Sequence, residues 1–331
     1  MEEKKLLEVK NLKVSFFTQI GIVNAVDDVS FNVYSDKIIG IVGESGCGKT
    51  VTVCSIMNIL PPNGKIMEGK INYYRKGNAI EISSTDPKGK MMREIRGKEI
   101  AIIFQEPMSY LSPVYTVGNQ IMEGLMLYYP KISKKESRER AIELLSDVGI
   151  QSPEKRIDSY VFELSGGMAQ RVIIAMAISG KPRILIADEP TTAIDVTLQA
   201  KVLELLKEIK QKNKMSVVII SHNMGVISQI ADEVLVMYLG LVVEKGKTKD
   251  IFKNPMHPYT RDLLKSIPKL NDRFRSKLKT IKGSIPNQYL KRTACPYKNR
   301  CSEYSKCKVR EVPDMVEIEK EHFVRCLLYR K

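Results

Sequence analysis

The stretch GESGCGKT, residues Gly43–Thr50, decides the fold of this 331-residue chain. It matches the pattern G-x-x-x-x-G-K-[ST] of a phosphate-binding loop. The apolar run KIIGIVG (37–43) precedes it and is typical of a buried parallel strand, and KTVTVCSIMNIL (49–60) follows with helical spacing. A strand, a glycine-rich turn and a helix are the context that the motif requires. The stretch therefore predicts an α/β fold with a phosphate site at the start of a helix.

The residue types of this loop suit an anion. Glycines let the backbone wrap close to a phosphate, and successive N–H groups and the helix N-terminus then point at it. Lys49 is expected to reach the β- and γ-phosphates of a nucleotide, and the Thr50 hydroxyl to bind Mg²⁺. A glycine-rich turn that binds nothing is the alternative. The predicted nucleotide contacts are Gly43, Glu44, Ser45, Gly46, Cys47, Gly48, Lys49, Thr50 and Val51.

A second apolar strand ends in two carboxylates. RILIADEP (183–190) places Asp188 and Glu189 at the carboxyl end of a predicted strand, where α/β sheets bind ligands. Asp188 is placed to hold Mg²⁺, and Glu189 is the candidate general base for an attacking water. An acidic pair at a strand end could also cap a helix, but the phosphate loop in the same chain favours the catalytic interpretation.

The remaining periodic stretches extend this pattern. LLEVKNLKVSFF (6–17) and VDDVSFNVYS (26–35) read as strands, and MSVVIISH (215–222) is another buried strand. VTLQAKVLELLKEIKQK (196–212) is an amphipathic helix. Strands that alternate with helices predict a parallel sheet.

Two further helices and a change of composition predict the domain organisation. ERAIELLSDVGI (139–150) and MAQRVIIAMAISG (168–180) indicate an inserted helical region at about 106–180. After NPMHPY (254–259), prolines, charges and cysteines replace the periodic pattern. We therefore expect a domain over 1–265 and an extension over 266–331.

Composition bounds the location and the partners. The start of the chain is charged, and the longest apolar run, VLVMYLGLVV (234–243), is about half of a membrane-spanning helix, so a cytoplasmic location is expected. The net charge of +15 points to an anionic partner: a nucleotide, a nucleic acid, a lipid headgroup or an acidic protein surface. Residues 270–331 carry 16 Lys and Arg against 7 Asp and Glu, and so +9 of that charge.

Four of the six cysteines lie in this basic tail: Cys295, Cys301, Cys307 and Cys326. Disulfides are rare in the cytoplasm, which leaves inert buried cysteines, a zinc site or an iron–sulfur cluster. Zinc sites usually pair cysteines about two to four residues apart, whereas five residues separate the first three cysteines here. The charge of either metal site would be offset by the basic residues Arg300, Lys306, Lys308, Arg310 and Arg325.

The stretch LSGGMAQR (164–171) places these motifs in a family. Six ordered motifs resemble the ATP-binding subunits of ABC transporters over about residues 6–265. Besides the phosphate loop they are Gln105 in IFQEP, LSGGM at Leu164–Met168, DEP at 188–190, TAID at Thr192–Asp195 and ISH ending at His222. The resemblance implies an α/β P-loop fold: a RecA-like parallel core, N-terminal antiparallel strands, a helical subdomain and a C-terminal metal-binding extension.

The resemblance also implies that two ATPase subunits, identical or paralogous, sandwich two ATPs. Ser165, Gly166, Gly167 and Met168 would then face the γ-phosphate held by the opposite subunit, since they open a helix. Asp195 would shape the loop that crosses the dimer. Closure of the pair would depend on ATP, and hydrolysis would release it.

Further roles follow for single residues. Gln105 would reach Mg²⁺ and the attacking water, and His222 would bind the γ-phosphate and hold the geometry of Glu189. Phe16 would stack on adenine, with Phe17 as the neighbouring candidate and plain core packing as the alternative.

Other stretches resemble the ATPase subunits of dipeptide and oligopeptide importers, a group that includes nickel importers. They are LSGGM, DVTLQAKVLELL, NPMHPYT, GSIPN and the cysteine tail. Met168 replaces the glutamine of the general signature. Val161-Phe162 stand where Pro-His is common, so no role of that histidine is carried over. Cys47 is either a small filler or, because loop N–H groups favour a thiolate, an oxidation-sensitive thiol.

The resemblance implies cofactors and partners as well. ATP and Mg²⁺ are expected, and the tail of some peptide-importer ATPases binds a [4Fe–4S] cluster, which favours that cofactor over zinc. The expected partners are a second ATPase subunit, a membrane permease and, indirectly, an extracytoplasmic substrate-binding protein. The chain would be peripheral, at the cytoplasmic face of the cell membrane.

Two competing hypotheses are weaker. A non-transport ABC ATPase acting on DNA or ribosomes would use the positive charge, but such proteins usually carry a long coiled coil or two cassettes. No nucleic-acid partner is therefore expected. An export-type subunit is disfavoured by the importer motifs and by the lack of a fused membrane domain.

Overall fold

The computed structural model describes residues 4–192, 195–267, 281–286, 289, 293–307 and 311–329. These residues form two compact units, and each is described by itself. The first unit takes the described residues of 1–6, 33–37 and 85–219, and the second takes those of 7–32, 38–84 and 220–331. The two units interleave along the chain. The domain boundary predicted near 265 stays a prediction.

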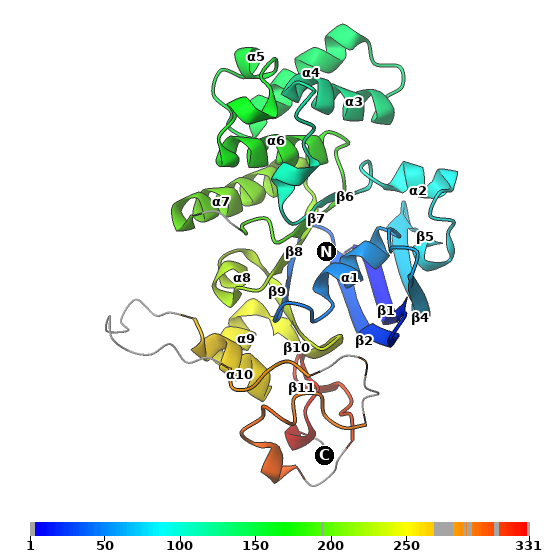
Figure 1. Cartoon of the computed structure of the whole chain (residues 1–331), viewed down its shortest axis with the longest axis vertical. Helices are drawn as coiled ribbons and strands as arrows, with labels where there is room; N and C mark the ends of the chain where they lie inside the picture. Colours follow the sequence, from blue (N-terminus) through cyan, green and yellow to red (C-terminus); the bar gives the residue numbers. More distant parts are fainter. Residues whose placement is uncertain are drawn as a thin grey trace. The chain divides into compact units, whose positions relative to one another are not determined.

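Most of an antiparallel sheet lies in the second unit, with the strand order β2-β1-β4-β5 (Figure 1). Its strands are β1 (Lys5–Thr18), β2 (Gly21–Tyr34), β4 (Gly64–Arg75) and β5 (Asn78–Glu81). In β1 the alternation of Leu7, Val9 and Val14 with polar neighbours buries one face of the strand. The two strands predicted near the N-terminus are confirmed.

A second sheet carries the phosphate loop, and its strands in this unit follow the order β11-β12-β10-β9-β3. They are β3 (Ile38–Val42), β9 (Glu233–Tyr238), β10 (Leu241–Lys247), β11 (Val316–Glu319) and β12 (His322–Val324). β3 and β9 are parallel, but β10, β12 and β11 are added antiparallel. The sheet is therefore mixed: the predicted parallel pairing is found at β3 and β9, whereas the antiparallel strands at this edge were not predicted.

The longest apolar run of the sequence, residues 234–243, is a hairpin of β9 and β10. Leu239 and Gly240 form its two-residue turn, with φ values of 46° and 78°. Positive φ at both central residues suits the twist of paired strands. Among the described residues, no helix combines the length and hydropathy that crossing a membrane requires.

The helices of the second unit are short. The predicted helix over 49–60 ends early, because Asn58 takes a left-handed φ of 51° two residues after α1 ends. The α-helices are α1 (Lys49–Ile56), α8 (Met224–Ile230), α9 (Thr248–Lys253) and α10 (Pro258–Lys265), and the 3₁₀ turns are η1 (Ile82–Ser84), η4 (Tyr304–Lys306) and η5 (Leu327–Tyr329).

The first unit combines parallel strands with most of the helices. β6 (Ile100–Ile103) pairs in parallel with β7 (Ile184–Asp188), and α3, α4 and α6 pack against one another. The predicted helices appear as α4, α6 and α7. The remaining bounds are α2 (Lys90–Ile95), η2 (Pro107–Tyr110), α3 (Val117–Tyr128), α4 (Lys134–Asp147), α5 (Pro153–Arg156), η3 (Val161–Glu163), α6 (Gly166–Ile178), α7 (Val196–Asn213) and β8 (Ser216–Ser221), whose last two residues belong to the second unit.

Candidate functional site

The phosphate loop, residues 43–50, joins β3 to α1 in the second unit. β3 is buried along its whole length, which fixes the point where the loop begins. Gly48 takes a left-handed φ of 99°, and a side chain there would meet the carbonyl oxygen of Ala25 at 2.4 Å. A side chain at Gly43 would come within 2.2 Å of the carbonyl oxygen of Met237. The surrounding backbone therefore leaves room for glycine alone at both positions.

The ammonium of Lys49 lies inside this loop. It donates to the carbonyl oxygens of Gly43 at 2.8 Å and Glu44 at 3.0 Å, and its side chain is buried. Thr50, the next residue of α1, is exposed. The positive charge of Lys49 and the helix N-terminus are both favourable for phosphate groups. The loop thus carries the cation and the backbone geometry that a nucleotide's phosphates require.

Cys47 is a buried thiol of the same loop. Burial raises its pKa, and the nearby Lys49 opposes that rise only in part. A raised pKa means less thiolate and slower oxidation. This favours the small-filler interpretation of Cys47 over an oxidation-sensitive thiolate.

Asp188 and Glu189 stand at the end of β7 in the first unit. The Asp188 side chain is fully buried. Glu189 takes a left-handed φ of 48°, and its carboxylate accepts hydrogen bonds from the Thr192 hydroxyl at 2.9 Å and the Gln105 amide at 3.4 Å. Unusual backbone geometry at a carboxylate held by two donors is common at functional sites. The structure therefore brings together Gln105 and Glu189, two of the three predicted catalytic residues.

The signature residues begin α6. The Ser165 hydroxyl caps this helix and accepts the N–H of Met168 at 3.3 Å. A side chain on Gly166 would meet no atom within 4 Å, so this end of the helix is open. Asp195 caps α7 in the same way and accepts the N–H of Leu198 at 2.9 Å. Ser165 and Asp195 are both exposed, so the N-termini that they cap are open to solvent, and such helix ends suit anion binding.

The predicted nucleotide residues are distributed over both units. Phe16, the phosphate loop and His222 belong to the second unit, whereas Gln105, Asp188 and Glu189 belong to the first. Their assembly into one site stays a prediction. His222 is exposed directly after β8. The ring of Phe16 lies over Gly64, where an added side chain would meet it at 2.8 Å, and Phe17 is 41% exposed, so the choice of adenine-stacking residue stays open.

The four tail cysteines gather in the second unit. Burial raises the pKa of Cys295 to about 11 and that of Cys326 to about 12. A smaller contribution to Cys326 comes from the charges of Cys295, Cys307 and Cys301, so the four sulfurs lie within electrostatic reach of one another. Among the described residues, however, no group of three or more His, Cys, Asp or Glu is arranged to hold a metal ion. The structure thus shows a cluster of thiols and does not show a metal site.

The arginines beside these cysteines bind carboxylates. Arg300 pairs with Glu44, and Arg325 donates to Asp28 at 2.7 Å. Their charges are thus already paired, and the expectation that the basic residues of the tail offset the charge of a metal site stays a prediction. Lys306 lies 3.8 Å from Glu303. Lys308 and Arg310 lie outside the described residues.

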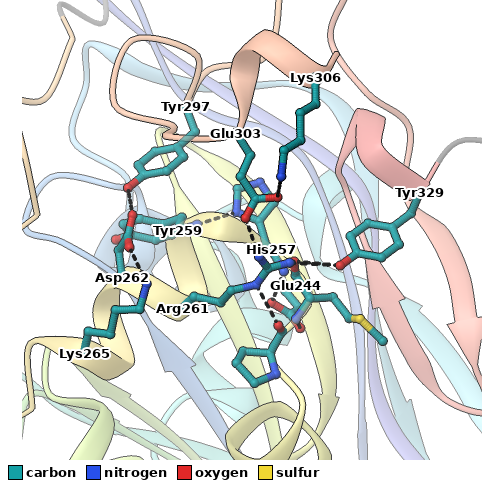
Figure 2. Close-up of polar contacts among 12 residues, drawn as sticks. Glu244, His257, Tyr259, Arg261, Asp262, Lys265, Tyr297, Glu303, Lys306 and Tyr329 are labelled. Carbon is teal, nitrogen blue, oxygen red and sulfur yellow. Dashed lines mark hydrogen bonds and ion pairs between the residues drawn. The ribbon is translucent and has the colours of Figure 1, made fainter. Parts of the chain in front are cut away.

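A polar network fastens the cysteine segment, residues 295–307, to α10. Figure 2 shows Arg261 at its centre, 2.5 Å from the carboxylate of Glu303 and 3.0 Å from the hydroxyl of Tyr329. The Tyr297 hydroxyl donates to Asp262 at 2.7 Å. These partners are separated by 35 to 68 residues in sequence, so no local pattern could have predicted them.

Two family descriptions match the chain. The ABC transporter family matches residues 26–192, and the C-terminal region of oligopeptide and dipeptide transporters matches residues 243–307. The first match spans the phosphate loop, the signature and the acidic end of β7. The second spans most of β10, all of α10 and the first three tail cysteines.

Curated relatives match nearly the whole chain. The dipeptide transport ATP-binding protein DppD of Bacillus subtilis (strain 168) is 46% identical over 98% of this chain and 95% of its own length. The oligopeptide transport ATP-binding protein AppD of the same organism is 44% identical over 98% of this chain and 97% of its own length.

Solved structures share the fold. A dimeric, post-hydrolysis form of the ATP-binding cassette MJ0796 with ADP and Pi has a TM-score of 0.63, with 26% identity over 73% of this chain and 98% of that one. The cassette cbiO1 of Clostridium perfringens, part of the complex cbiONQ, also has a TM-score of 0.63, with 26% identity over 76% of this chain and 92% of that one. Together with the phosphate loop, the signature and the acidic strand end, these matches show that the chain belongs to the ABC transporter family, as an ATP-binding protein with the C-terminal region of the oligopeptide and dipeptide transporters.

Proposed function

We propose that this chain is the ATP-binding and ATP-hydrolysing subunit of an importer of dipeptides or oligopeptides. One observation carries the proposal: a phosphate loop with Lys49 at its centre lies in a chain 46% identical, over 98% of its length, to a protein named for dipeptide transport. The two parts of the proposal can be tested separately. ATP hydrolysis is measured on the chain with its partners, and the identity of the cargo is measured on the assembled transporter.

The test of cargo is reconstitution with the permease and substrate-binding protein in proteoliposomes. ATP-dependent uptake of a labelled dipeptide or oligopeptide supports the proposal. Uptake of Ni²⁺ without uptake of peptide would replace peptide with nickel as the cargo. If the chain co-purifies with no integral membrane protein of its host, the importer assignment is wrong.

The hydrolytic residues are proposed from the acidic strand end. Glu189 acts as the general base, because the Thr192 hydroxyl and the Gln105 amide hold its carboxylate in place. Asp188, Thr50 and Gln105 are the residues that would hold Mg²⁺, an ion that neutralises phosphate charge when bound. His222 would contact the γ-phosphate from the end of β8.

The signature residues are proposed to bind ATP held by a second subunit. Ser165 and Asp195 each accept the N–H of the third residue of the helix that they cap, α6 and α7, and the open side of Gly166 leaves space for a phosphate. The related cassette MJ0796 has been solved as a dimer. A homodimer and a pair with a paralogous subunit fit these observations equally.

The permease is proposed to dock on exposed apolar side chains of the first unit. Tyr160 and Phe162 stack at 5.5 Å, and Phe162 is 74% exposed. Large exposed apolar residues in neighbouring stretches of this unit include Tyr110, Val114, Tyr115, Met126 and Leu127. Such residues are typical of protein interfaces. Binding there would place the chain at the cytoplasmic face of the membrane.

The tail cysteines are proposed to hold a [4Fe–4S] cluster, with zinc as the alternative. Four thiols within electrostatic reach of one another fit a four-cysteine donor set. The cluster would be held by Cys295, Cys301, Cys307 and Cys326.

A further inference from the structure

The carboxylate of Glu44, the second residue of the phosphate loop, forms a two-point ion pair with Arg300. Nη1 of Arg300 lies 2.6 Å from Oε2 of Glu44, and Nη2 lies 2.9 Å from Oε1. The Arg300 side chain is only 3% exposed, whereas that of Glu44 is 23% exposed. Bidentate geometry and a buried guanidinium distinguish this contact from an ordinary surface ion pair. The pair spans 256 residues of sequence.

Arg300 has several partners besides Glu44. Its Nε donates to the carbonyl oxygen of Lys282 at 2.9 Å, and Nη1 lies 3.4 Å from the hydroxyl of Tyr238. The rings of Tyr238 and Tyr297 lie 5.8 and 5.9 Å from the guanidinium carbon. The guanidinium therefore loses little further freedom when it pairs with the loop.

A second contact fixes the backbone of the same loop residue. The N–H of Glu44 donates to the hydroxyl of Tyr259 at 2.9 Å. Tyr259 is fully buried and packs against Tyr238 and Tyr297, with ring centroids 4.7 and 5.3 Å away. Lys49 donates to the carbonyl oxygen of Glu44. The backbone N–H, the carbonyl and the carboxylate of this residue thus all have partners within the second unit.

The ion pair has an electrostatic consequence for phosphate binding. A carboxylate in a phosphate loop repels the negative charge that the loop must accept, and the repulsion is strong where water is partly excluded. Arg300 neutralises this carboxylate and holds it by both oxygens. Without Arg300, the charge of Glu44 would act against the phosphates.

We propose that Arg300 is a positioning residue of the nucleotide site, through which the cysteine segment sets the affinity of the phosphate loop for ATP. Arg300 acts through Glu44 and does not itself touch the nucleotide. Its backbone lies in a turn of the cysteine segment, where the N–H groups of Arg300 and Cys301 both donate to the carbonyl of Tyr297 at 3.0 Å. The fold of this turn therefore decides whether the guanidinium reaches Glu44. The proposal rests on the phosphate loop as the ATP site.

The test is the affinity of the full chain for ATPγS with Mg²⁺, measured by calorimetry for a double-mutant cycle. Arg300→Met is expected to weaken binding about tenfold, since it leaves Glu44 unpaired beside the phosphates. The double variant Glu44→Gln/Arg300→Met is expected to bind ATPγS more tightly than Arg300→Met, because it no longer carries the repelling charge, and Glu44→Gln alone measures the direct effect of losing the carboxylate. Rescue of the arginine variant by the second substitution is a result that a merely structural arginine would not give.

Arg261→Met is the matched control. It also removes an arginine that anchors the cysteine segment, through Glu303. The other partners of this arginine are the carbonyl oxygens of Pro255 and Met256 and the hydroxyl of Tyr329, so its contacts lie outside both the phosphate loop and the turn that carries Arg300. Its affinity for ATPγS is expected to equal that of the wild type. Thermal unfolding followed by circular dichroism identifies any variant that is not folded.

Coupling must also act in reverse, since it is reciprocal. ATPγS is expected to slow hydrogen exchange at the amides of Lys298, Arg300 and Cys301 in the wild type and to have no such effect in Arg300→Met.

Several results would overturn the proposal. One is wild-type affinity for ATPγS in Arg300→Met. Another is a double variant, or an Arg261→Met control, that binds ATPγS as weakly as Arg300→Met. The last is a wild-type chain in which ATPγS does not change the rate of amide hydrogen exchange at Lys298, Arg300 and Cys301. Each of these leaves the ATPase assignment intact if the wild type binds ATPγS. A wild type that binds no nucleotide would refute the ATPase assignment and this proposal together.

Discussion

The imidazole of His322 lies 2.8 Å from the carboxylate of Glu244, and neither side chain exposes more than 1% of its surface (Figure 2 shows Glu244). Glu244 also accepts the backbone N–H groups of Met256 and His257, at 2.7 and 2.9 Å. One buried carboxylate of β10 thus joins β12 to the segment that leads into α10. Three donors satisfy a charge that would otherwise be costly to bury.

This pair predicts a dependence of stability on pH. The hydrogen bond with Glu244 raises the pKa of His322, and desolvation opposes it only in part. A histidine with a raised pKa stabilises the fold fully below its unfolded value of about 6.5, and this contribution is lost as the pH rises through the folded value. We therefore expect His322→Gln to lower the free energy of unfolding more at pH 6 than at pH 9. Urea unfolding of both proteins at each pH measures this; an equal loss at the two pH values would show that His322 is neutral in the folded state.

The second prediction concerns the general base. Glu189→Gln is expected to lower the rate of ATP hydrolysis about 10²–10⁴-fold, because proton transfer to a positioned carboxylate typically contributes that much. Binding of ATPγS should persist. Thr192→Val removes one of the donors that hold Glu189 and should lower turnover by a smaller factor. The rate of ATP hydrolysis is measured as phosphate release by the assembled transporter. A near-normal rate in Glu189→Gln would show that Glu189 is not the general base.

The third prediction concerns Lys49. Lys49→Ala should weaken ATPγS binding itself, because the loop loses the cation that its own carbonyls now hold. Lys212→Ala is the control, since Lys212 pairs with Asp147 in the first unit. Calorimetry at two salt concentrations compares the variants, and equal affinity of Lys49→Ala and the control would contradict the loop assignment.

The fourth prediction concerns the tail thiols. Purified without oxygen, the chain is expected to be coloured and to hold about four irons and as many sulfides. Cys301→Ser should lower the iron content, whereas Cys54→Ser, a cysteine of α1 outside the tail, should not. Metal analysis distinguishes the outcomes: about one zinc in a colourless protein would make the tail a zinc module. A chain without metal would refute both cofactors.

The sequence predicted the local parts of this molecule well. A phosphate loop, a strand that ends in Asp188 and Glu189, and a helix capped by Ser165 each lie within one short stretch, so their motifs carry their geometry. The exception is the end of α1, where Asn58 takes a left-handed conformation that helical spacing does not reveal.

Contacts between distant segments were not predictable. The basic residues of the tail were expected to balance a metal site, but Arg300 and Arg325 reach Glu44 and Asp28, 256 and 297 residues away. Strands β11 and β12 were also missed, because four and three residues are too few to show a clear alternation. Pairing partners across such distances are set by the tertiary fold, and local patterns in a single sequence do not reveal them.

The pairing of β12 with β10 bears on how this protein can be shortened. A chain cut after residue 265 would keep every ATP motif, yet β10 would become an open edge with unpaired backbone groups. The same cut would remove His322 and leave Glu244 short of one donor. We expect such a fragment to associate edge to edge with its own copies, which the pairing of β12 prevents in the full chain.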